Sequence, residues 1–136
     1  MVARMRHIAL LVNDPEASAQ FFENAFGMKR AGNAGRGLYM SDGVINIALL
    51  KVRPEKEKTG LFHFGMWVDD LDQAAQDVEK AGGSYLMGRP DGHPNTFYEV
   101  KYQGPDGIVF DLTHSGWRGA VKEVVPAPAV AKEPAE

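Results

Sequence analysis

The chain has 136 residues, 44% of them hydrophobic, and a formal net charge of -3. This length supports one compact domain with a core, but not two independent domains. The slight acidity, without a long basic run, gives no attraction to nucleic acid or to an anionic membrane surface, and no apolar run approaches the roughly 20 residues of a membrane span. We therefore expect a cytoplasmic protein that acts on a small molecule, with no nucleic-acid or membrane partner.

Cysteine is absent from the sequence. Disulfide bonds and thiolate ligands are therefore excluded. A bound metal would have to be held by histidine and carboxylate groups, which suit Fe, Mn, Ni, Co or Zn.

A stretch near the start of the chain recurs 56 positions later. The offset maps His7 onto His63 and Asp14 onto Asp70. In each copy a histidine stands near the start of an apolar run of strand length, and an acidic residue that can cap a helix follows seven positions later. The chain therefore consists of two copies of one unit, which must pack against each other or against a second molecule.

The first unit is predicted to be a strand, a helix and three further strands. The strand covers residues 7–12, and the helix covers residues 15–26 between an Asp14 cap and Gly27. The three later strands are predicted at 28–31, 37–40 and 44–52, with turns at 32–35 and at the hairpin signal Ser41-Asp42-Gly43. Residues 53–60 are charged and are predicted to be an exposed linker.

The second unit repeats this order. A strand at 61–68 precedes a helix that opens at Asp70 and closes at Gly82-Gly83, and strands follow at 84–87, 97–103 and 108–113. The loop at 88–95 accounts for the greater length of this unit. We thus predict one domain over 1–117, with module one at 5–52, the linker at 53–60, module two at 61–115 and a flexible tail at 118–136.

The two repeat histidines and one aspartate predict a metal site. His7 and His63 become neighbours if the two units pair their first strands about a pseudo-twofold axis. Asp111 stands among apolar neighbours in the last strand, where a carboxylate is costly to bury unless it meets a cation or hydrogen-bond donors. Two histidines and one carboxylate form a set that leaves positions open for substrate.

Two motifs together resemble the vicinal oxygen chelate superfamily. His-x-x-x-x-Val-x-Asp opens each unit and Gly-Pro-Asp-Gly-x-x-x-Asp closes the second, and the resemblance covers about residues 5–115. That family includes glyoxalase I, extradiol dioxygenases, fosfomycin-resistance thiol transferases, methylmalonyl-CoA epimerase and bleomycin-binding proteins. The resemblance implies an α+β fold of two βαβββ modules, whose curved mixed sheets surround a divalent metal that chelates two adjacent substrate oxygens.

The resemblance also implies a ligand set. The family's ligands fall on His7, His63 and Asp111, the last being normally Glu, and the cofactor is then a divalent metal, Fe(II) first, with Zn, Ni, Mn or Co as alternatives. Counting from the Asp-Gly turn, the fourth ligand of glyoxalase I falls on Ile47, next to Asn46. The four-ligand pattern is therefore absent, and the three-ligand set is that of extradiol dioxygenases and fosfomycin-resistance proteins.

Candidates for acid–base catalysis lie just before the last ligand. Relatives with a catalytic tyrosine place it ten residues earlier, which falls here on Lys101, and in that register Glu99 and Lys101 share the face of Asp111. A shift of one residue would turn Tyr102 inward instead, because side chains alternate along a strand. His93, in the longer loop, could move protons as a lid residue. An exposed, purely structural lysine or histidine is the alternative at both Lys101 and His93.

The sequence thus predicts a metal-dependent dioxygenase or a glyoxalase-like lyase or isomerase. A metal-free sequestering protein of the bleomycin-resistance type and a fosfomycin-resistance-like thiol transferase are the alternatives. We expect a homodimer, in which the metal site lies within one chain or is shared between two.

Overall fold

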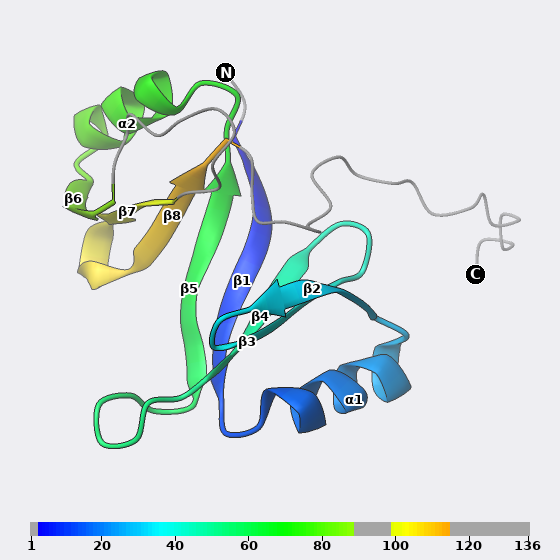
Figure 1. The fold of residues 1–136 in the computed structure, drawn as a ribbon. Helices are drawn as coiled ribbons and strands as arrows, with labels where there is room; N and C mark the ends of the chain where they lie inside the picture. Colours follow the sequence, from blue (N-terminus) through cyan, green and yellow to red (C-terminus); the bar gives the residue numbers. More distant parts are fainter. Residues whose placement is uncertain (1–2, 89–98, 115–136) are drawn as a thin grey trace, which may run out of the picture.

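The described part of the protein, a computed structural model, comprises residues 3–88 and 99–114 and forms one mixed sheet of eight strands with two α-helices (Figure 1). Module one contains β1 (Arg4–Val12), α1 (Pro15–Phe26), β2 (Lys29–Ala34), β3 (Gly37–Ser41) and β4 (Asn46–Lys51). Module two contains β5 (Gly60–Trp67), α2 (Leu71–Lys80), β6 (Ser84–Met87), β7 (Val100–Gln103), a 3-10 turn (Pro105–Gly107) and β8 (Val109–Thr113). The predicted α+β fold of two βαβββ modules is confirmed.

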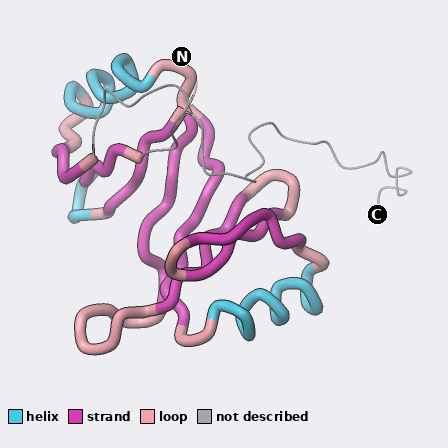
Figure 2. The backbone as a smooth tube through the Cα atoms, viewed as in Figure 1, coloured by secondary structure: helices cyan, strands magenta, loops and turns pink. Residues whose placement is uncertain are grey.

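The sheet joins the modules through their first strands. Its order is β2-β3-β4-β1-β5-β8-β7-β6, and β1 pairs with β5 in antiparallel orientation. On the outer sides, β4 runs parallel to β1 and β8 runs parallel to β5. This arrangement is the pseudo-twofold pairing expected from the repeat, and it leaves α1 and α2 at opposite ends of the molecule (Figure 2).

Both central strands carry a bulge next to their histidine. On β1 the extra residue is Arg6, because the pair Met5↔Met66 is followed by His7↔Gly65. On β5 the extra residue is Phe62, because the pair Ala9↔His63 is followed by Leu10↔Leu61. Arg6 and Phe62 are 56 positions apart and are therefore equivalent in the repeat. Bulges redirect the side chains beside them, and these two determine how the histidines leave the strands.

The two helices begin as the sequence predicts. The Asp14 carboxylate accepts hydrogen bonds from the amides of Glu16 and Ala17, and Asp70 accepts one from Gln73. Gly27, at φ 69°, ends α1 in the left-handed conformation that glycine adopts at least cost. Each helix covers one face of its own module.

Two apolar clusters lie beneath the helices, on the face of the sheet away from the histidines. Under α1 the buried members are Ala19, Met28, Leu38, Met40 and Leu49. Under α2 they are Val68, Leu71, Ala74, Val100, Tyr102 and Leu112. Burial of each cluster fixes which residues of each strand turn to the opposite face, where the polar groups lie.

The first-module hairpins differ in detail from prediction. Ser41 pairs with Asn46, so the loop comprises residues 42–45 and not the predicted turn at 41–43. The Asp42 carboxylate accepts hydrogen bonds from the amides of Val44 and Ile45, which holds those residues out of the ladder. The strand predicted from residue 44 accordingly begins at Asn46, and β2 continues to Ala34, through most of the predicted turn.

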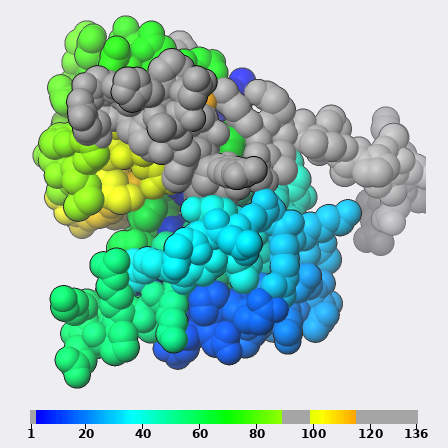
Figure 3. All heavy atoms as spheres, viewed as in Figure 1, coloured from blue at the N-terminus to red at the C-terminus, as the bar shows by residue number. Residues whose placement is uncertain are grey.

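Module one forms the lower part and module two the upper part of the space-filling view, and residues 52–59, which connect β4 to β5 along the chain, protrude at the lower left (Figure 3). No helix among residues 3–88 and 99–114 is long and apolar enough to cross a membrane. His93, most of the long loop and the 118–136 tail lie outside the described residues.

Candidate metal and acid–base site

The buried part of the site spans three neighbouring strands, with Gly65 on the middle one. On β5, Gly65 pairs with His7 of β1 on one side and with Asp111 of β8 on the other. A Cβ atom at position 65 would lie 1.7 Å from Cε1 of His7. The missing side chain therefore lets the imidazole pass over β5 and reach Asp111.

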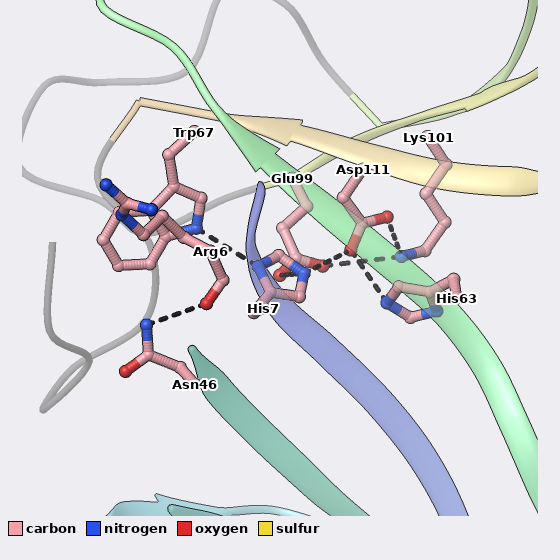
Figure 4. A network of polar contacts seen from close by, with 8 residues as sticks. All are labelled: Arg6, His7, Asn46, His63, Trp67, Glu99, Lys101 and Asp111. Atoms are coloured by element: carbon pink, nitrogen blue, oxygen red, sulfur yellow. Dashed lines mark hydrogen bonds and ion pairs between the residues drawn. The ribbon is translucent and has the colours of Figure 1, made fainter. Parts of the chain in front are cut away.

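Asp111 is the centre on which the other groups converge (Figure 4). Its Oδ2 atom lies 3.2 Å from Nε2 of His7 and 2.8 Å from Nε2 of His63. Glu99 approaches from the other side, with Oε1 3.7 Å from Nε2 of His7. Asp111 and His7 are completely buried, so the inner wall of the site is closed.

Lys101 is the cation of the cluster. Lys101 and Asp111 are cross-strand partners on β7 and β8, and Nζ lies 2.6 Å from Oδ1 of Asp111. The same ammonium lies 3.4 Å from Oε2 of Glu99. Asp111 thus accepts hydrogen bonds at both of its oxygens.

Trp67 determines which nitrogen of His7 carries the proton. The indole Nε1–H donates to Nδ1 of His7 at 3.1 Å, and a tryptophan can only donate. Burial lowers the pKa of His7, against the opposing effect of its hydrogen bond with Asp111, so the ring is neutral near pH 7. The neutral ring therefore has its proton on Nε2, which donates to Asp111.

The two carboxyl groups titrate at very different pH values. Burial alone would raise the pKa of Asp111, but hydrogen bonds from His63 and His7 hold it well below its usual range. Burial, with a further contribution from its hydrogen bond to Asp111, raises the pKa of Glu99 to about 8. Two acids whose pKa values are driven apart in one site are suited to separate roles in proton transfer.

Four of these groups form a set that fits a divalent metal. One ligand atom from each of His7, His63, Glu99 and Asp111 lies within 4.8 Å of all the others. Imidazole nitrogens with carboxylate oxygens suit Fe, Mn, Ni, Co and Zn. The contacts described above join these same groups.

Among the remaining predicted residues, Tyr102 does not lie near the cluster. It is buried in the apolar cluster under α2, and its hydroxyl donates to Glu79 at 3.4 Å. The pairing Lys101↔Asp111 turns Lys101 to the site, and alternation then turns Tyr102 to the opposite face. The register left open by the sequence is thus the one that brings Lys101 and Glu99 inward.

The strand register also changes which residue corresponds to the fourth ligand of glyoxalase I. Asp111 pairs with Gly65, and in module one the equivalent of Gly65 is Ala9, which pairs with Ala48. The residue that corresponds to Asp111 is therefore Ala48 and not Ile47. Asn46 is fully buried and donates instead to the carbonyl of the bulged Arg6 at 2.9 Å.

Two residues of the site were not predicted from the sequence. Gly65 and Trp67 follow His63 at spacings of two and four, which places all three on one face of β5. That alternation was visible in the sequence. The contact of Trp67 with His7 could be found only once the pairing of β1 with β5 was known.

A hollow lies elsewhere on the described surface. It has a volume of about 520 Å³ and contains none of the clustered residues. Its lining is Leu10, Leu11, Val12, Asn13, Asp14, Ala17, Ser18, Thr59, Gly60 and Leu61. Because it offers one carboxylate that already caps α1, we assign it no chemistry.

Solved structures with the same fold include proteins of several activities. A 2,3-dioxygenase, LapB from Pseudomonas sp. KL28, is 21% identical with a TM-score of 0.63, and the match covers 93% of this chain and 46% of that one. Methylmalonyl-CoA epimerase from Streptomyces coelicolor, in complex with 2-nitronate-propionyl-CoA, is 19% identical with a TM-score of 0.60, covering 85% and 99%. At these identities the likeness shows the fold alone.

A superfamily member from Vibrio splendidus 12B01 is 22% identical with a TM-score of 0.61, and the match covers 84% of this chain and all of that one. No curated protein matches the sequence. The family described as Glyoxalase/Bleomycin resistance protein/Dioxygenase superfamily matches residues 4–112, which contain both modules and the whole cluster. The chain therefore belongs to the glyoxalase/bleomycin resistance protein/dioxygenase superfamily.

Proposed function

We propose that the protein is a divalent-metal-dependent enzyme whose small substrate binds the metal through two adjacent oxygens. The observation that carries this proposal is the convergence of His7, His63, Glu99 and Asp111 within 4.8 Å. A divalent ion held there would polarise the substrate oxygens and stabilise negative charge that develops on them. Fe(II) is our first choice, with Zn, Ni, Mn or Co as alternatives.

The partly exposed side chains of the cluster mark the side from which substrate can enter. The side chains of Glu99 and Lys101 are 18% and 22% exposed, whereas those of His7 and Asp111 are inaccessible. Where His7, His63 and Asp111 alone hold the ion, Glu99 can keep its proton near neutral pH and donate it to substrate or, once ionised, accept one. The Lys101 ammonium can bind an anionic substrate group.

Metal content is the direct test of this proposal. We expect purified protein loaded with Fe(II), Mn(II) or Zn(II) and then desalted to retain about one ion per chain. His63→Ala and Asp111→Ala should lose it, whereas Asp106→Asn, which changes an exposed carboxylate in the same hairpin, should retain it. Failure of the unaltered protein to retain any of the three ions would contradict the proposal.

Two reaction classes then remain to be separated. An O2-dependent ring cleavage requires Fe(II) and consumes O2 with a catechol-type substrate, and a lyase or isomerase reaction proceeds with Zn or Ni and without O2. Anaerobic reconstitution with each metal, followed by oxygen-electrode and substrate-loss assays, distinguishes them. The known structures include both a dioxygenase and an epimerase, so we propose both classes for testing.

A metal-free binding protein is the second candidate. One specific observation favours it: Asp111 contacts His7, His63 and Lys101, so groups of the chain itself can compensate its charge. Such a protein would bind its ligand equally well with a chelator present and with a divalent metal ion present. Ligand binding that persists unchanged in His63→Ala with chelator present would support this candidate over the enzyme.

We further propose a homodimer. The outer strand β6 exposes Tyr85, Leu86 and Met87, which is an apolar edge of the kind that a second copy covers. Light scattering during gel filtration should give about twice the chain mass of 14.9 kDa. The cytoplasmic location stays a prediction.

A further inference from the structure

Lys101 contacts two of the four groups that the proposed function assigns to the metal. Its Nζ atom lies 2.6 Å from Oδ1 of Asp111 and 3.4 Å from Oε2 of Glu99. Its side chain is 22% exposed, against none for Asp111. The ammonium therefore closes the open side of the cluster.

This contact compensates the negative charge of Asp111. Asp111 is fully buried, and a buried carboxylate is stable only when a cation or several donors compensate it. Lys101 is the only lysine or arginine that an ion pair joins to Asp111 among the described residues. The protein thus supplies, from its own chain, the positive charge that a metal would otherwise bring.

Simultaneous contact of the Lys101 ammonium and a divalent ion with Asp111 would cost electrostatic free energy. Any ion bonded to the clustered ligand atoms would lie a few ångströms from an ammonium held 2.6 Å from one of them, and like charges at that separation in a buried site repel strongly. The lysine side chain is long and flexible and ends at the exposed side. It can therefore withdraw toward solvent, where an anionic group of the substrate would meet it.

We infer that Lys101 is a resident cation that competes with the metal, so that the divalent ion binds Asp111 only as the ammonium withdraws. This inference rests on the proposed function. It makes Lys101 a residue with two successive partners, first Asp111 and then substrate. It also makes metal affinity lower than the four ligands alone would give.

The test is the affinity of the full-length protein for Mn(II). Lys101→Met keeps the length of the side chain and removes its charge, whereas Lys101→Arg keeps the charge. We expect Lys101→Met to bind Mn(II) about tenfold more tightly or better, and Lys101→Arg to stay within about threefold of the unaltered protein. Isothermal titration and electron paramagnetic resonance of free Mn(II) both measure these affinities.

Thermal unfolding gives a second readout that a merely structural lysine would not produce. In chelator, the midpoint of Lys101→Met should fall, because Asp111 loses its counter-charge. Saturating Mn(II) should raise the unfolding midpoint of Lys101→Met by more than it raises that of the unaltered protein. Lys29→Met, at an exposed position in β2, controls for the change in net charge and should match the unaltered protein in both conditions.

The outcomes separate the inference from the proposed function. If the unaltered protein binds Mn(II) and Lys101→Met binds it equally or more weakly, the inference is overturned and the proposed function stands. If neither protein binds any divalent ion, both are overturned. Should Lys101→Met fail to fold, Lys101→Gln, whose amide can still donate to Asp111, is measured by the same criterion.

Discussion

The position of His7 depends on an absent side chain on the neighbouring strand. Gly65 lies between His7 and Asp111 in the sheet, and the imidazole occupies the space that a Cβ there would fill. The requirement at Gly65 is therefore steric and not conformational. Its backbone is not in the left-handed region.

Gly65→Ala should displace the imidazole. We expect a loss of about 1–3 kcal/mol in the free energy of unfolding from overpacking, together with loss of metal retention. Urea denaturation and metal analysis measure the two effects. Gly35→Ala is the matched control, since its Cβ would meet nothing within 4 Å, and equal losses in both variants would contradict the steric argument.

Trp67 selects the tautomer of His7 through one hydrogen bond. In ion-free protein, long-range ¹H–¹⁵N spectra should show His7 with Nε2 protonated and Nδ1 unprotonated. In Trp67→Phe the donor is gone, and the Nδ1 resonance should move toward the value of an imidazole nitrogen without a hydrogen bond. A protonated Nδ1 in the unaltered protein would contradict the assignment of the tautomer.

At the scale of elements, local chemistry fixes where helices start, and this is why sequence could predict it. The Asp14 carboxylate lies within hydrogen-bond distance of two free amides of the first turn of α1, and this arrangement needs only neighbours in the chain. Strand register is different, because it depends on a partner far away in sequence. The choice between Lys101 and Tyr102 could not be made until β7 was paired with β8.

Asp14→Ala should destabilise the protein by about 1 kcal/mol, because two amides at the start of α1 lose their acceptor. Thermal or urea unfolding measures this loss. Asp14→Asn should restore most of the stability, since the asparagine oxygen can accept the same bonds. Asp72→Ala, in the first turn of α2 but without a capping bond in the described structure, should cost clearly less; a similar cost would point to charge and not capping.

The bulges show what a repeat in sequence cannot reveal. The 56-residue offset predicted the pairing of β1 with β5 and the approach of His7 to His63. It did not predict that the residue before each histidine, Arg6 and Phe62, is extruded from the ladder. Arg6 and Phe62 have no feature in common, so only the geometry of the pair of strands shows the equivalence.

At the scale of the whole molecule, the cluster couples stability to pH. The pKa of Glu99 is about 8 in the folded protein, against an ordinary value of 4.5. Between these values the folded state keeps a proton that the unfolded chain has released. Unfolding therefore releases a proton in this window, and the free energy of unfolding must fall as the pH rises.

In chelator, we expect the free energy of unfolding to fall between pH 7 and pH 8 by up to about 1.4 kcal/mol per pH unit. Below pH 6.5 the lowered pKa of His7 adds a slope of opposite sign. The contribution of Asp111, whose pKa is lowered, is lost only at more acidic pH and leaves this window unaffected. Glu99→Gln should remove the slope. Urea titrations at several pH values measure it, and a slope that persists in Glu99→Gln would assign the proton to another group.

Because β1 lies in the middle of the sheet, its pairing depends on strands that are synthesised later. His7 leaves the ribosome 104 residues before its partner Asp111, and β1 pairs on one side with a strand of the other module. A nascent chain halted before β8 therefore contains both histidines and Glu99 but lacks Asp111, on which the histidines converge. The cluster can therefore form only after β8 has been synthesised, and until β5 follows, the edge of β1 that β5 covers is open to pairing with other chains.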